Sequence, residues 1–118
     1  RVGREKGALR VVNDQIMSPT HTADVAEAIV ASLRNEVPPG TYHAVNSGQA
    51  SWYDFACRII ERADVEAAVE PIPSSEFPQT AQRPAYSVLD NSRLAGLIGD
   101  MPPWEKALER YLSAKGHI

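Results

Sequence analysis

The strongest structural signal in the sequence is a helix that begins at Ser51. Asp54 follows Ser51 at the spacing of a capping box, in which two residues satisfy each other's backbone N–H groups. Apolar residues then recur at steps of three and four along one side of the helix, and these are Trp52, Phe55, Ala56, Ile59, Ile60 and Ala63. Because such a face has to be buried against another element, the rest of the chain must supply a packing layer.

The same periodicity predicts three further helices, each with a recognisable beginning or end. They are expected over residues 20–34, capped by Thr20 or Thr22, over 92–98, capped by Asp90 or Asn91, and over 101–116, with Pro103 in the first turn. The expected buried faces are Val25, Ala26, Ile29, Val30 and Leu33 in the first of these, and Trp104, Ala107, Leu108, Tyr111 and Leu112 in the last. The sequence therefore predicts four helices in all.

Three short runs between the helices are typical of strands. They cover residues 9–13, 41–46 and about 69–72, and the middle run alternates too poorly for a solvent-facing edge, so we expect it to be mostly buried. Strands interleaved with helices indicate an α/β fold. Strands buried on both faces need neighbours, so we expect these few to belong to a larger sheet.

Composition limits the kinds of partner. The 118 residues, 43% of them apolar, suit one domain with a real core, and a net charge of −3 gives no general attraction to nucleic acid or anionic membranes. A single cysteine, Cys57, and the lack of a long apolar run favour a reducing cytoplasm. Because the chain begins at Arg1 and not at Met, we expect it to be a fragment of a longer protein.

Common catalytic and cofactor motifs are missing from the sequence. No G-x-G-x-x-G opens a helix after a strand, and no G-x-S-x-G places a nucleophile. His21, His43 and His117 are scattered, and none lies near Cys57 at ligand spacing, so no metal site is predicted.

Two loops carry residues suited to binding. Residues 14–20 include Gln15 and Thr20 between a strand and a helix, although Thr20 could equally be a helix cap. In the second loop Pro84 favours an extended backbone at Arg83, whose planar fork of donors matches a phosphate. The alternative is that Arg83 pairs with a carboxylate, such as Glu76 or Asp90.

Four segments in the right order resemble the carboxyl-terminal portion of the dTDP-4-dehydrorhamnose reductase family, among the extended short-chain dehydrogenase/reductases. They are VVNDQIMSPTHTADVAEAI, GTYHAVNSGQASWYDFACRII, VEPIPSSEFPQTAQRPAYSVLDNSRL and PPWEKAL, and the similarity runs from about Leu9 to Leu112. The chain departs from the family pattern at Met17, where the family usually has a glycine.

The resemblance implies that residues 1–118 are the substrate-binding portion of a Rossmann-type reductase, and that the NAD(P)-binding portion is absent. NADPH or NADH would be bound by that absent portion, which would also carry the catalytic Tyr-x-x-x-Lys pair. Here only Tyr111 and Lys115 match that spacing, on an apolar helix stripe. We therefore expect no catalytic residue in this chain and no activity from it alone.

Substrate contacts implied by the resemblance are Arg83 at the diphosphate, with Gln15, Thr20, Tyr86 and Ser87 near the sugar or nucleotide. The expected partner is a nucleotide sugar, and a homo-oligomer is compatible with the family. Two alternatives stay open. One is a non-catalytic member of the fold, like the regulatory subunit of methionine adenosyltransferase, and the other is an epimerase or dehydratase acting on another nucleotide sugar.

Overall fold

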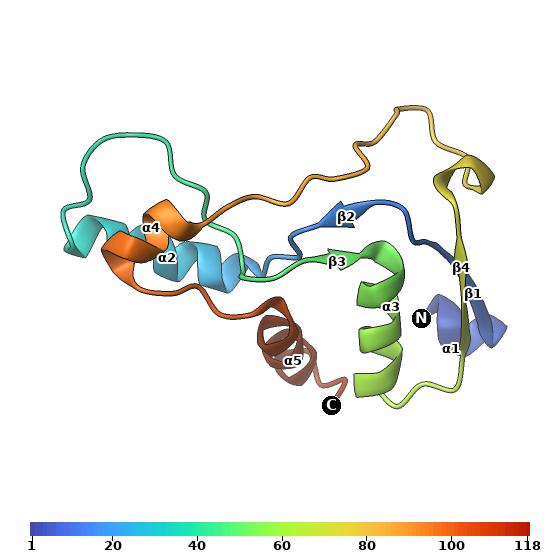
Figure 1. Ribbon diagram of the computed structural model, residues 1–118. Coiled ribbons are helices and arrows are strands. Elements are labelled where there is room, and N and C mark those ends of the chain that lie inside the picture. Colours follow the sequence, from blue (N-terminus) through green and yellow to red (C-terminus); the bar gives the residue numbers. More distant parts are fainter.

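The computed structural model describes residues 1–118 and shows an α/β chain drawn out along one direction (Figure 1). Its elements are α1 (Val2–Lys6), β1 (Ala8–Val12), β2 (Ile16–Met17), α2 (Thr22–Arg34), β3 (Ala50–Ser51), α3 (Trp52–Arg62), β4 (Ala68–Ile72), the 3-10 helix η1 (Ser74–Glu76), α4 (Ser92–Ile98) and α5 (Trp104–Ala114). The α/β prediction is confirmed, and all four predicted helices are present. The five-residue α1 was not expected, because it is too short to show periodicity.

The strands form two separate pairs. β1 and β4 are parallel, with Ala8 opposite Ala68 and Val12 opposite Ile72. β2 and β3 are antiparallel and only two residues long each. Figure 1 shows α3 and α1 beside the parallel pair, while α2 and α4 lie together at the far end of the molecule. A parallel pair without further strands is unusual, because parallel sheets normally have neighbours and both faces covered.

The predicted strand over residues 41–46 is wrong, because this segment is extended but joins no sheet. Its backbone bonds to side chains instead. Asn46 N–H donates to Thr20 Oγ1 over 3.3 Å, and the Val45 carbonyl accepts from Asn91 Nδ2 over 2.9 Å. Extended backbone without a neighbouring strand cannot form a ladder.

The predicted capping box is confirmed, and the predicted cap of α2 is wrong. Asp54 N–H donates to Ser51 Oγ over 3.0 Å, and Ser51 N–H donates to the Asp54 carboxylate over 2.9 Å. At α2 the capping position is His21, with no side-chain cap. Its backbone N–H is satisfied from outside the helix, by Asn46 Oδ1 at 2.8 Å.

The core consists of two small clusters. One joins α3 to α5 and contains Ala50, Trp104, Leu108 and Leu112, with Phe55 and Ile59 packed against it. The other joins α2 to α4 and contains Ala28, Leu94 and Met101. The stripe predicted for α5 is buried except for Tyr111, which is exposed.

The apolar face predicted for α2 is not the face that it buries. Ile29, Val30 and Leu33 are exposed, Leu33 by 75%, whereas Ala28 and Asp24 are buried. The reason is that α2 meets α4 through Ala28. The larger apolar side chains are left without a partner in this chain.

The surface area shows that much of the chain is uncovered. The accessible surface is 7890 Å², compared with roughly 6,300 Å² expected for a compact protein of this mass. The radius of gyration is 16.4 Å, compared with about 13.5 Å for a compact domain of this length. These differences show that the chain is more extended, and exposes more surface, than a compact domain of its size.

Candidate functional site

Backbone pairing at β2 brings the two predicted binding loops together. Ile16 N–H donates to the Ala85 carbonyl over 2.9 Å, and Ser87 N–H donates to the Ile16 carbonyl over 2.9 Å. Ile16 therefore bridges to Tyr86 in parallel. In Figure 1 the long connection from η1 to α4 passes above β2 and β3. This pairing places the Arg83 segment next to Gln15.

A polar hollow of about 810 Å³ opens between these loops. Its walls come from two stretches that are distant in sequence, residues 14–15 and residues 74–85. The lining residues are Asp14, Gln15, Ser74, Ser75, Phe77, Gln79, Thr80, Ala81, Gln82, Arg83, Pro84 and Ala85. Gln15 is only 8% exposed, and it is one of the residues that line this hollow. Its amide, which can both donate and accept hydrogen bonds, therefore borders the space where a ligand would sit.

Arg83 lines the hollow and makes no ion pair within the chain. Both carboxylates that could have paired with it are engaged elsewhere. Glu76 accepts from Arg10 at 2.5 Å, and Asp90 accepts from the Ser92 N–H at 2.8 Å. The alternative that Arg83 is the partner of Glu76 or Asp90 is therefore wrong.

Asp14 fixes the edge of the hollow by holding the loop after β4. Its carboxylate accepts the Ser74 backbone N–H at 3.0 Å and the Ser74 hydroxyl at 2.9 Å. The backbone hydrogen bond from Ser74 is the main reason that the pKa of Asp14 is lowered from its ordinary value. The carboxylate is thus held in its ionised form at the rim.

Tyr86 and Ser87 lie next to the hollow without lining it. The Tyr86 hydroxyl donates to Gln49 Oε1 over 2.9 Å, and the Ser87 hydroxyl donates to the Ile16 carbonyl over 3.3 Å. Ser87 therefore serves to dock the segment on β2. Of the five predicted contact residues, the hollow brings together Arg83 and Gln15.

A comparison with known protein families decides the relationship. Residues 1–116 match the family described as the RmlD substrate binding domain. The chain belongs to this family.

Relatives of this RmlD domain are longer proteins. The spore coat polysaccharide biosynthesis protein SpsK of Bacillus subtilis is 42% identical over 98% of the chain, which covers 40% of SpsK. A dTDP-4-dehydrorhamnose reductase structure from Clostridium acetobutylicum has a TM-score of 0.90 and 33% identity, over 98% of this chain and 41% of that one. A Bacillus anthracis reductase of the same name, in complex with NADP, has a TM-score of 0.87 and 39% identity, over 97% and 41%. The RmlD domain thus spans about two fifths of these proteins.

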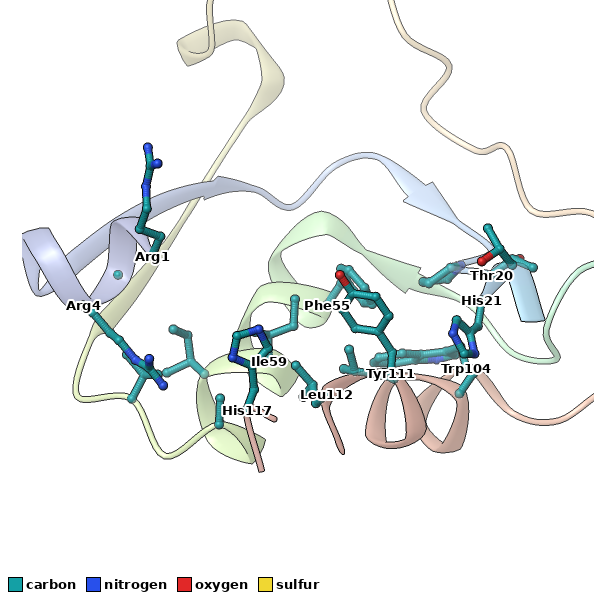
Figure 2. A pocket seen from close by; sticks show the side chains of 18 residues that line it. Arg1, Arg4, Thr20, His21, Phe55, Ile59, Trp104, Tyr111, Leu112 and His117 are labelled. Carbon is teal, nitrogen blue, oxygen red and sulfur yellow. The ribbon is translucent and has the colours of Figure 1, made fainter. Parts of the chain in front are cut away.

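Thr20 belongs to a different cavity from the other predicted residues. Its hydroxyl donates to the Ser18 carbonyl over 3.0 Å and accepts the Asn46 backbone N–H over 3.3 Å. It lies at one end of an apolar pocket of about 550 Å³ between α1, α3 and α5 (Figure 2). Tyr111 lines the same pocket, with its ring edge-to-face against His21 at 5.8 Å. Thr20 and Tyr111 are therefore placed away from Arg83.

Met17 replaces a glycine of the family pattern without strain. It lies in β2 opposite Ala50, and it is not among the residues with positive φ. Since extended backbone suits any side chain, the RmlD domain needs no glycine at this position.

The glycines of this RmlD domain do not form the turn that holds a dinucleotide in a Rossmann fold. Such a site needs a glycine turn that opens a helix directly after a strand. Gly7 instead follows α1, Gly99 ends α4, and Gly48 packs its backbone on Trp104, whose Cδ1 lies 3.0 Å from where a Cβ would stand. None of these three glycines therefore forms a phosphate-binding turn.

The RmlD domain shows neither a metal-binding group of side chains nor a membrane-spanning helix. No group of three or more His, Cys, Asp or Glu side chains is placed to hold a metal ion. None of the helices has the length and apolar character needed to cross a membrane.

The residues that sequence reasoning missed are Asp14, Ser74, Phe77, Gln79 and Gln82. Asp14 and Gln82 are chain neighbours of predicted residues, so their positions offered a signal. Ser74 and Phe77 offered none, because they reach the hollow only through the pairing of β1 with β4 and the Asp14 contact.

Proposed function

We propose that this chain binds the nucleotide sugar in an NADPH-dependent reductase that converts dTDP-4-dehydro-L-rhamnose to dTDP-L-rhamnose. Membership of the substrate-binding family supports the binding role. The similar Bacillus anthracis reductase, in complex with NADP, supports the reaction and its cofactor. The single observation that carries the proposal is an unpaired arginine, Arg83, in a polar hollow.

The chemistry of the hollow suits a nucleoside diphosphate. An arginine fork binds phosphate oxygens with two parallel charged hydrogen bonds, and Pro84 restricts the backbone that carries Arg83. The volume of about 810 Å³ falls within the range of ligand pockets. The amide of Gln15, which lines the hollow, offers a neutral donor and acceptor to the sugar or phosphate. The net charge of −3 makes this local arrangement necessary for binding an anion.

Hydride transfer belongs in this proposal to the part of the protein outside residues 1–118. NADPH, when bound there, supplies the hydride for the 4-keto carbon. The chain itself has no glycine turn for a dinucleotide, and neither a tyrosine nor a lysine is among the residues that line the hollow. We therefore expect the purified 118 residues to give no NADPH oxidation above background with dTDP-4-dehydrorhamnose, and steady oxidation would contradict this division.

The decisive experiment is calorimetric titration of the complete protein with dTDP. Charged hydrogen bonds contribute roughly 1.5–3 kcal/mol, so Arg83→Ala is expected to weaken binding about ten- to a hundredfold. NADPH binding should stay nearly unchanged, and Arg83→Lys should recover part of the loss because a point charge does not reproduce the fork.

The matched control is Arg34→Ala, at an exposed arginine in the last turn of α2 that makes no ion pair. It should leave dTDP affinity unchanged at the same salt concentration. Equal dTDP affinity in Arg83→Ala and wild type would remove the phosphate role of Arg83.

A further inference from the structure

Phe77 is an exposed aromatic ring on the wall of an otherwise polar hollow. It is 51% exposed, and it is the one aromatic residue among those that line the hollow. Arg83 lines the same hollow. A flat apolar face and an unpaired cation therefore share one site, and a ligand that uses both must have a flat ring system and an anionic group.

The turn that carries Phe77 is anchored on β1 and on the loop that follows β1. Ser74, at the start of η1, is held by Asp14, and Glu76 is held by Arg10 of β1 at 2.5 Å. Phe77 N–H closes the turn by donating to the Ser74 carbonyl over 3.1 Å. The ring is thus presented from an ordered turn, which lowers the entropy lost when a ligand stacks on it.

We propose that the Phe77 ring stacks on the nucleobase of the nucleotide sugar while Arg83 holds its diphosphate. The inference rests on the function proposed above and adds the residue that recognises the base. Stacking on an aromatic face binds any base. The side-chain amides of Gln79 and Gln82, on the same wall, offer the donors and acceptors that a base edge requires.

The test uses the complete protein with two probes, dTDP and inorganic pyrophosphate, in calorimetric or competition titrations. Phe77→Leu keeps an apolar side chain but removes the π face, and it is expected to weaken dTDP binding about five- to a hundredfold. Phe77→Tyr keeps the face and should bind dTDP within about threefold of wild type. Pyrophosphate has no base, so its affinity should be the same in both variants as in wild type.

The outcomes separate this inference from the function on which it rests. Wild-type dTDP affinity in Phe77→Leu, or an equal loss for pyrophosphate and dTDP, would overturn the stacking role. If Arg83→Ala leaves both probes unaffected, the phosphate role fails instead. A fall in the melting temperature of Phe77→Leu with unchanged dTDP affinity would show that Phe77 packs against other protein, and this also overturns the inference.

Discussion

Asn46 donates a hydrogen bond to the carboxylate of Asp24 over 2.6 Å, and the two residues are 1% and 2% exposed. The same amide donates to the Pro102 carbonyl over 3.0 Å and accepts the His21 N–H over 2.8 Å. Arg110 of α5 also bonds to Asp24. The buried Asn46 side chain thus connects the start of α2, the extended segment that carries Asn46 and the entry to α5.

Asn46→Asp should be among the most destabilising single changes in the chain. It puts a second carboxylate against Asp24 and removes the amide donor. An uncompensated buried charge costs about 3–5 kcal/mol, which urea unfolding of the complete protein would measure. Asn13→Asp is the matched control, because Asn13 is exposed and its side chain makes no hydrogen bond. Equal stability of the two variants would contradict the role of the buried amide.

Ser51→Ala should destabilise the protein by about 1 kcal/mol, because it removes one half of the capping box of α3. Ser113→Ala, at an exposed position of α5, provides the comparison and should change stability by less than about 0.5 kcal/mol. Thermal unfolding by circular dichroism checks both. The prediction fails if the two alanine variants have the same melting temperature.

Asp14 should make stability depend on pH in the acid range. Its pKa is lower in the folded state than in the unfolded one because Ser74 donates to the carboxylate. The resulting stabilisation is complete above the unfolded value, about pH 4, and is lost as the pH falls through the folded pKa. The stability difference between wild type and Asp14→Asn should therefore shrink from pH 6 to pH 3. A constant difference would rule this out, and Asp100→Asn, at an exposed residue without a hydrogen bond, is the control.

The isolated 118 residues should expose apolar surface or self-associate. Ile29, Val30 and Leu33 form an uncovered stripe on α2, and the β1–β4 pair has no further strand. Open edges and apolar patches favour association. Leu33→Glu should reduce dye binding and association in sedimentation experiments. A monomer that melts cooperatively and binds no dye would show that the chain covers its own apolar side chains and strand edges.

Local signals in the sequence predicted helices well and their packing less well. Ser51 and Asp54 identify the start of α3 because a capping box involves residues three apart. The stripe of Ile29, Val30 and Leu33 correctly indicates an apolar helix face. Periodicity does not say which protein covers that face, and in this chain α2 uses Ala28 instead.

The candidate site was predictable only residue by residue. Pro84 beside Arg83 indicated a fixed arginine, and Gln15 lay in a loop of the right type. Their meeting depends on Ile16 pairing with the 85–87 segment, about 70 positions later. Such a pairing leaves no local pattern, since hydrogen bonds between backbone groups are independent of side-chain identity.

The pairing of β1 with β4 has a consequence for synthesis on the ribosome. Ala8 and Ala68 lie sixty positions apart, and so do Val12 and Ile72. At about 5–20 residues per second, β1 is synthesised roughly three to twelve seconds before its partner strand has been made. During that interval its edge is open to other nascent chains. Slower translation through residues 13–67 would lengthen the interval during which β1 has no partner strand.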